Sequence, residues 1–142
     1  MLPVLTPSQM AAADVAAPEP IDELIDRAGR AVARTALDML GGSYGRVVVV
    51  IAGKGNNGAD GRVAAAVLRR RGVQVKIVDA AALPATLPSA GLVIDAAYGT
   101  GFRGEWLPPD VGTTLVLAVD VPSGVDALTG VASGHVLRAD CT

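Results

Sequence analysis

The chain has 142 residues, enough for one compact domain with its own core. Hydrophobic residues make up 51% and aromatic residues only 3%, so the core must consist of Val, Leu, Ile and Ala, as in a parallel sheet covered by Ala-rich helices. A formal net charge of -2 does not favour nucleic acid or anionic membranes, and no apolar run approaches the roughly 20 residues that span a bilayer. Cys141 is the single cysteine, which excludes an intrachain disulfide and a cysteine-based metal site. We therefore expect a soluble, cytoplasmic protein with no nucleic-acid or membrane partner.

Two helices are predicted before the first strand. Thr6 can cap the first helix, Pro7 suits its first position, and Gln9 can complete a capping box. The "PEP" stretch at 18–20 ends this helix and starts another, which ends at Gly41-Gly42. Apolar residues recur at helical spacing in the second helix: Leu24, Ile25, Ala28, Val32, Ala36, Leu37 and Leu40.

From residue 46 onward, short apolar strands alternate with crossover segments. The pattern predicts strands at 46–52, 73–78, 91–95 and 115–120, and a helix at 58–71. The stretch 80–90 resembles a linker but is too short to divide domains, and "HVLRADCT" at 135–142 begins like a further strand. We therefore expect one domain, 1–142, with a parallel sheet of Rossmann type.

A glycine-rich loop follows the first predicted strand. Its letters, "GKGNNGADG" at 53–61, contain the G-x-G-x-x-G dinucleotide fingerprint, and Asp79 lies about 20 residues further on, where that fingerprint places a ribose-binding acid. The fingerprint alone is weak evidence, because Asn-Gly and Asp-Gly are ordinary turn formers. Asn57 can merely cap the helix and Asp60 can merely compensate its dipole. The polar side chains of Asn56, Asn57 and Asp60 nevertheless lie close together in this loop, which favours a binding role.

Two further strand ends carry an acid followed by glycine. Asp95 precedes Gly99-Thr100-Gly101, and Asp120 begins the stretch "DVPSG", which contains Ser123. Either acid can simply close a turn, or it can act as an acid/base or cation ligand. Because ligands bind outside the carboxyl ends of parallel strands, all three loops are expected to meet at one edge of the sheet.

Other polar and aromatic residues give weaker signals. Tyr98, Phe102 and Trp106 can stack on a ring or pack at the rim. His135 has no partner motif and is expected at the surface, and Ser123 lacks the nucleophile-elbow context of a hydrolase. Lys54 does not complete a P-loop.

Several motifs in order and spacing resemble the YjeF N-terminal domain family of NAD(P)H-hydrate epimerases. They are "GKGNNGADG", "DAAYGTGFRGE", "VDVPSGVDALTG" and "RADCT", while "LTPSQMAAAD" and "IDELIDRAGRAVA" resemble the two leading helices of that family. The resemblance covers nearly the whole chain. It implies a Rossmann-like three-layer α/β/α fold with a mostly parallel sheet and two extra N-terminal helices.

The resemblance also implies an activity, a cation and partners. The reaction would be epimerisation of the R and S forms of the hydrated cofactors NADHX and NADPHX, with one K+ per subunit, in a homodimer. A fused or separate ADP- or ATP-dependent NAD(P)HX dehydratase would be a partner. Asp120 would be catalytic, and Asn57, Asp95 and Ser123 would hold potassium. Substrate contacts would come from Asn56, Asn57, Gly58, Ala59, Asp60, Gly99, Thr100, Gly101, Phe102, Arg103, Gly104, Glu105 and Asp120.

The chain departs from the family pattern in two respects. Ala59 stands where the family usually has glycine, and family domains continue beyond the "AD-x-T" segment, so the C-terminal part of the domain is expected to be missing. Two other functions stay open on the sequence. One is a redox enzyme that uses intact NAD(P), and the other is a non-catalytic nucleotide-binding or interaction module.

Overall fold

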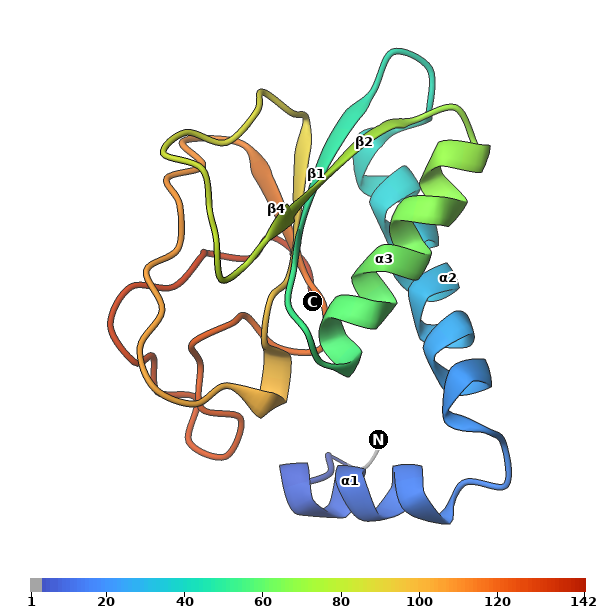
Figure 1. The fold of residues 1–142 in the computed structure, drawn as a ribbon, viewed down its shortest axis with the longest axis vertical. Helices are drawn as coiled ribbons and strands as arrows, with labels where there is room; N and C mark the ends of the chain where they lie inside the picture. The colour runs from blue at the N-terminus through green and yellow to red at the C-terminus, as the bar shows by residue number, and fades with distance from the viewer. Residues whose placement is uncertain (1–3) are drawn as a thin grey trace.

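A four-stranded parallel sheet of order β2-β1-β3-β4 forms the centre of the computed structural model, which describes residues 4–142 (Figure 1). The strands are β1 (Val47–Ala52), β2 (Gln74–Asp79), β3 (Leu92–Ala96) and β4 (Leu115–Ala118). β1 is central and pairs in parallel with both β2 and β3, with Val48 opposite Val75 on one side and Leu92 on the other. The parallel sheet predicted from the alternation is confirmed, with strand ends displaced by at most two residues.

Two long helices cover one face of the sheet (Figure 1). α2 (Ile21–Leu40) and α3 (Asn56–Arg70) pack with the side chains of Val48, Val50 and Ile94 in the larger apolar core. The helices approach closely at Gly29, where a Cβ atom would lie 2.5 Å from Val63 Cβ. α2 ends as predicted at Gly41, which adopts the left-handed conformation. Among residues 4–142, no helix is both long and apolar enough to cross a membrane.

The opposite face of the sheet is covered differently from the helical layer expected there. Val49, Ile51 and Val93 point to this side and pack with Leu137, Trp106 and other residues of the segments that follow β2, β3 and β4. Within residues 4–142, the regular helix in these segments is one 3-10 turn, η1 (Gly99–Gly101). Many prolines and glycines in these segments favour turns over helix, which explains the irregular layer.

α1 (Pro7–Ala16) lies apart from the two core helices (Figure 1). Its predicted capping box is confirmed: Gln9 N–H donates to Thr6 Oγ1 at 3.3 Å, and Thr6 N–H donates to Gln9 Oε1 at 2.9 Å. None of its residues is buried. The cap, rather than core packing, therefore sets where this helix begins.

The C-terminal segment runs beside β4 as the sequence pattern suggested. Cys141 forms a parallel bridge with Leu117, and its carbonyl accepts from Ala118 N–H at 2.9 Å. The Asp140 carboxylate accepts from Val116 N–H at 2.8 Å. This pairing amounts to an isolated bridge and not to a full strand, and it places residues 140–142 next to the end of β4.

Candidate active site

A cleft of about 740 Å³ lies at the carboxyl ends of β1, β3 and β4. After β1 the chain passes through α3 to β2, which pairs with one side of β1. The next strand, β3, pairs with the other side of β1, so the strand order changes direction between β1 and β3. Such a point is where open parallel sheets bind ligands. The expected meeting of three loops at one edge is confirmed. The cleft is lined by Met10, Asp14, Ala28, Ala31, Val32, Lys54, Gly55, Asn56, Asn57, Asp60, Ala97, Tyr98, Thr100, Gly101, Val119 and Asp120.

Two glycines of the fingerprint bring the loops together rather than face the cleft. A Cβ atom on Gly53 would lie 1.8 Å from the Ala97 carbonyl oxygen, and one on Gly58 would lie 1.9 Å from the Gly53 carbonyl oxygen. Any side chain at either position would force these backbones apart. The glycines thus fix the start of α3 against the loop after β3.

The first turn of α3 presents Asn57 to the loops after β3 and β4. The helix begins at Asn56, two residues earlier than predicted, and its N-cap is Gly55. Asn57 is therefore not the cap. Oriented to satisfy its neighbours, its amide donates to the Val119 carbonyl at 3.0 Å and accepts from Gly99 N–H at 3.2 Å. The absent Gly99 side chain leaves room for this, since a Cβ there would lie 2.8 Å from Asn57 Oδ1.

Asp95 and Ser123 form a fully buried pair beneath the cleft. The Asp95 carboxylate accepts from Ser123 Oγ at 2.6 Å, from Ser123 N–H at 2.8 Å and from Ala97 N–H at 3.2 Å. Ser123 Oγ in turn accepts from Tyr98 N–H at 2.9 Å and from Gly99 N–H at 3.4 Å. This network satisfies the buried polar groups of both residues and ties the ends of β3 and β4 to each other.

Asp120 stands at the cleft in a strained backbone conformation. Its φ is 70°, the only positive value among the non-glycine residues of the described chain. Its exposed carboxylate accepts from Thr100 N–H at 3.4 Å, and its carbonyl accepts from the Thr142 hydroxyl. Left-handed residues other than glycine cost energy and gather at functional sites, so this strain marks Asp120 as a functional candidate.

Asp60 is a second acid in the cleft, and its protonation is altered. Partial burial, together with the negative charges of Asp120 and Asp14, raises the pKa of Asp60 to about 6. Lys54 is the one basic residue among those that line the cleft. The cleft therefore holds a carboxyl that keeps its proton to higher pH than an ordinary aspartate, beside the carboxylate of Asp120.

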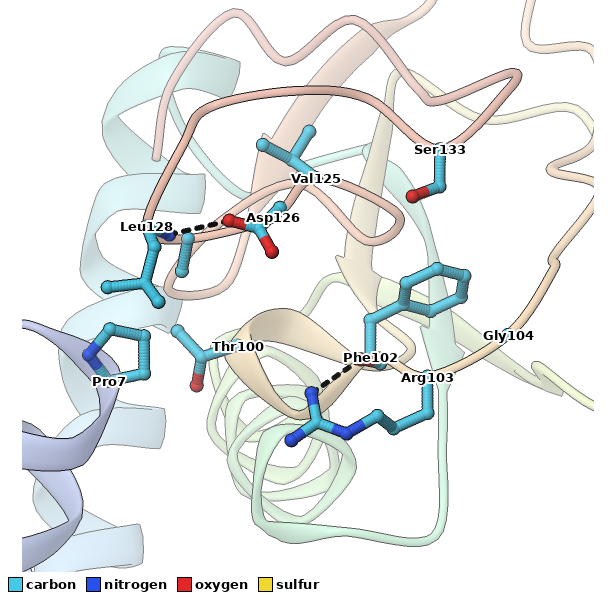
Figure 2. Close-up of a pocket in the computed structure, with 10 residues that line it drawn as sticks. Pro7, Thr100, Phe102, Arg103, Gly104, Val125, Asp126, Leu128 and Ser133 are labelled. Atoms are coloured by element: carbon cyan, nitrogen blue, oxygen red, sulfur yellow. Dashed lines mark hydrogen bonds between the residues drawn. The ribbon is translucent and has the colours of Figure 1, made fainter.

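A second cavity of about 290 Å³ adjoins the cleft (Figure 2). Thr100 lines both cavities. Phe102 lines the second cavity, and its ring meets that of Tyr98 edge-on with centroids 5.5 Å apart. The ring of Trp106 also packs against Tyr98, with centroids 5.5 Å apart, and its Nε1 donates to the Ala80 carbonyl, so Trp106 serves in rim packing.

The structure distributes the expected substrate residues over both cavities. The cleft receives Asn56, Asn57, Asp60, Thr100, Gly101 and Asp120, and the second cavity receives Thr100, Phe102, Arg103 and Gly104. Four others line neither cavity: Gly58, Ala59, Gly99 and Glu105. Gly58 and Gly99 instead provide space for neighbouring loops.

Sequence reasoning missed the contribution of the leading helices to the site. Met10 and Asp14 of α1, with Ala28, Ala31 and Val32 of α2, line the cleft. Pro7 of α1 lines the second cavity. Pro7, Met10 and Asp14 are three and four residues apart, which places them on one face of α1. The available signal was that α1 lacks the strong apolar stripe of a helix that packs on a core.

The expected potassium ligands lie close together. Gly99 N–H joins Asn57 to Ser123, and Ser123 bonds to Asp95. The Asn57 amide and the Val119 carbonyl lie 3.0 Å apart, so their oxygen-bearing groups are near the same point. Among residues 4–142, no group of three or more His, Cys, Asp or Glu side chains is placed to hold a metal ion. The donors present are hard oxygens, which fit an alkali or alkaline-earth ion.

The fold and the site together define an α/β domain with a carboxylate-bearing ligand cleft at the switch point of a parallel sheet. The family model described as YjeF-related protein N-terminus matches residues 21–85 and 76–142. The chain belongs to this family, as the motifs predicted.

Curated relatives carry names that refer to one kind of chemistry. The bifunctional NAD(P)H-hydrate repair enzyme Nnr of Hyperthermus butylicus is 36% identical over 159 aligned residues, which cover 84% of this chain and 29% of that protein. The NAD(P)H-hydrate epimerase of Leuconostoc mesenteroides is 34% identical over 157 residues, covering 87% of this chain and 69% of that protein. The chain thus spans under a third of the bifunctional relative and about two thirds of the epimerase.

The fold also occurs in a solved structure. The crystal structure of the yeast protein YNL200c superposes with a TM-score of 0.76 and covers 97% of this chain and 78% of that one. The sequences are 23% identical, so this likeness concerns the fold. The parallel sheet with its two leading helices is accordingly an established architecture.

Proposed function

We propose that this chain epimerises the R and S forms of hydrated NADH and NADPH in the cleft beside Asp120. The observation that carries the proposal is the convergence of Asn57, Asp60 and Asp120 at the switch point of a chain whose relatives are named NAD(P)H-hydrate epimerases. The positive end of α3 and Lys54 also face the cleft, where they favour an anionic ligand.

The reaction inverts the ring carbon that carries the hydroxyl group. In the route that we favour, the protonated form of Asp120 donates its proton to the leaving oxygen and becomes a carboxylate, the C–O bond breaks and water departs, which leaves a ring cation. A water molecule then adds to the opposite face and returns its proton to Asp120. Such acid–base assistance supplies about 10²–10⁴-fold in rate. Asp60, whose pKa is raised to about 6, donates a hydrogen bond to the substrate only while it is protonated, at and below about pH 6. Ring opening and reclosure is the alternative route.

The proposed potassium site would hold its ion through Asn57, Asp95 and Ser123, with the Val119 carbonyl as a further ligand. Bound there, the ion would supply positive charge that orients the ring carboxamide. Asp95 and Ser123 already satisfy each other, so they serve the fold as well as the ion.

The ion can be tested on the unaltered chain. Replacing potassium with tetramethylammonium, which is too large for this set of oxygens, is expected to weaken binding of the hydrate and to lower the melting temperature. Unchanged affinity and melting temperature would contradict the potassium site.

We also propose a partner activity for this reaction. Bifunctional relatives suggest that a second repair activity acts with this one, in a fused or separate dehydratase that uses ADP or ATP. A homodimer, a cytoplasmic location and a single domain over 1–142 stay predictions.

The function is tested with one purified epimer of NADHX or NADPHX. We expect the other epimer to appear faster than in protein-free buffer, and intact NADPH to compete poorly. Tight binding of intact NAD(P) with no epimerisation would instead favour a redox enzyme, and binding of neither would favour an interaction module.

A further inference from the structure

The cleft and the second cavity form one extended site. Thr100 lines both, and its backbone N–H donates to Asp120 at 3.4 Å. One face of α1 passes both cavities, with Pro7 at the second cavity and Met10 and Asp14 at the cleft. A ligand with two ends can therefore occupy both cavities along α1.

The second cavity presents one cation and one anion from different segments. Arg103 comes from the loop after η1, and Asp126 comes from the turn after β4; Figure 2 shows them on opposite sides of the cavity. No ion pair joins them among residues 4–142, where the described ion pairs belong to Arg27 and Arg30. Both charges are consequently available to a ligand.

Hydrogen bonds within its own loop orient each of these two charged side chains. Asp126 Oδ1 accepts from Leu128 N–H at 2.9 Å and from the backbone and hydroxyl of Thr129 at 2.8 and 2.9 Å, which leaves Oδ2 without a donor in the described chain. The bonds from Thr129 and Leu128, together with the positive charge of Arg103, lower the pKa of Asp126, so it stays a carboxylate. Arg103 is exposed and donates to the Phe102 carbonyl at 3.2 Å.

The remaining walls suit a nucleoside. The ring of Phe102 and the side chains of Pro7, Val125 and Leu128 provide apolar surface, and Ser133 adds a hydroxyl. Sites for nucleotide ligands combine apolar walls with a few placed polar groups in this way.

We propose that this cavity binds the adenosine ribose of the hydrated dinucleotide and reads its 2′ position. Asp126 accepts a hydrogen bond from the 2′-hydroxyl of NADHX, and Arg103 pairs with the 2′-phosphate of NADPHX. Dinucleotide-binding folds use an acid and an arginine for these two tasks. This inference rests on the proposed function, because it places the hydrated ring in the cleft.

Asp79, the acid that the fingerprint spacing favours for the ribose, is engaged elsewhere. It ends β2, accepts from Ala81 N–H at 2.9 Å and lines neither cavity. Asp126 takes that position in the proposed site.

Substrate preference provides the first test. With Arg103→Gln we expect KM for NADPHX to rise about tenfold while KM for NADHX stays within about twofold. Asp126→Asn keeps an oxygen for the turn and is expected to raise KM for NADHX alone. Arg34→Gln, an exposed arginine of α2 outside both cavities, is the matched control and should change neither. Equal effects of Arg103→Gln on the two substrates, or no effect, would overturn the proposal.

A binding experiment tests the cavity without epimerase activity. Adenosine 2′,5′-bisphosphate should bind the unaltered chain at least about tenfold more tightly than 5′-AMP, and Arg103→Gln should remove this preference. A preference that is missing in the unaltered chain, or that survives the substitution, would refute the cavity's role. A chain that binds the bisphosphate as expected yet does not epimerise would refute only the proposed function.

Discussion

Asp120 combines an exposed carboxylate with a backbone conformation that costs energy. Strain at a cleft-lining acid favours a chemical role over a turn-closing one. Asp120→Asn keeps the size and an acceptor for Thr100 N–H but cannot carry the proton. We expect the variant to bind NAD(P)HX within about tenfold of the unaltered chain and to lose most of its epimerisation rate.

The measurement is the rate of epimer interconversion, corrected for the spontaneous reaction, beside ligand titration. Asp110→Asn is a suitable control, because this exposed acid lies outside the cleft and only closes a turn with Gly112. Full activity of the Asp120 variant would move the catalytic role, with Asp60 as the next candidate.

Asp60 makes the stability of the chain depend on pH. The folded chain keeps this proton to about pH 6, whereas the unfolded chain releases it near 3.8, so folding binds protons between these values. Stability from this group therefore falls as the pH rises through that window. Because Asp60 is half-buried and screened by solvent, we expect Asp60→Asn to stabilise the chain by about 1 kcal/mol at neutral pH.

The check is urea unfolding of both forms above about pH 7 and at a pH well below 3.8, where Asp60 is protonated in both the folded and the unfolded state. The difference should vanish at the lower pH. A difference that is the same at both would mean that the carboxylate is not the cause.

At the scale of elements, α1 is expected to serve ligand binding more than stability. Pro7, Met10 and Asp14 line the cavities and none of its residues is buried, so the loss of this helix would cost little core packing. Thr6→Ala removes the hydroxyl that accepts from Gln9 N–H, while the backbone N–H of residue 6 can still donate to Gln9 Oε1, and this loss of the cap destabilises the helix locally by about 0.5–2 kcal/mol. We predict an increased KM for the hydrate with global unfolding, followed by fluorescence of the single tryptophan Trp106, nearly unchanged.

Val15→Ala is the matched control, since this side chain on α1 is 88% exposed and lines neither cavity. A large loss of global stability in Thr6→Ala would show that α1 supports the fold. An unchanged KM would show that α1 does not contact the ligand.

Patterns of neighbouring residues predicted most helices and strands. They did not predict features that depend on contacts between segments distant in the sequence. Thr6, Pro7 and Gln9 are adjacent in the chain, so the start of α1 followed from them alone. The start of α3 did not, because it depends on the packing of Gly58 against the Gly53 backbone, and Asn57 consequently lies inside the helix. The irregular layer over the second face likewise depends on contacts between segments distant in sequence.

For the whole molecule, the meeting of the three strand ends was predictable, because parallel strands point their carboxyl ends the same way. The sequence alone does not predict the direct bond between Asp95 and Ser123, because this bond depends on how the ends of β3 and β4 close on each other. The second cavity was not predicted at all. It forms where α1, the loop after η1 and the turn at 125–133 come together, and no local pattern in the sequence predicts these contacts.

The central claim is that this cleft interconverts the two epimers, and the most direct measurement starts separately from each pure form of NADPHX. A catalyst changes the rate of approach and not the final mixture. We predict that both reactions reach the same epimer ratio at a rate proportional to the concentration of the chain, with potassium present. A rate that equals the protein-free reaction at every concentration of the chain, from either epimer, would contradict the account.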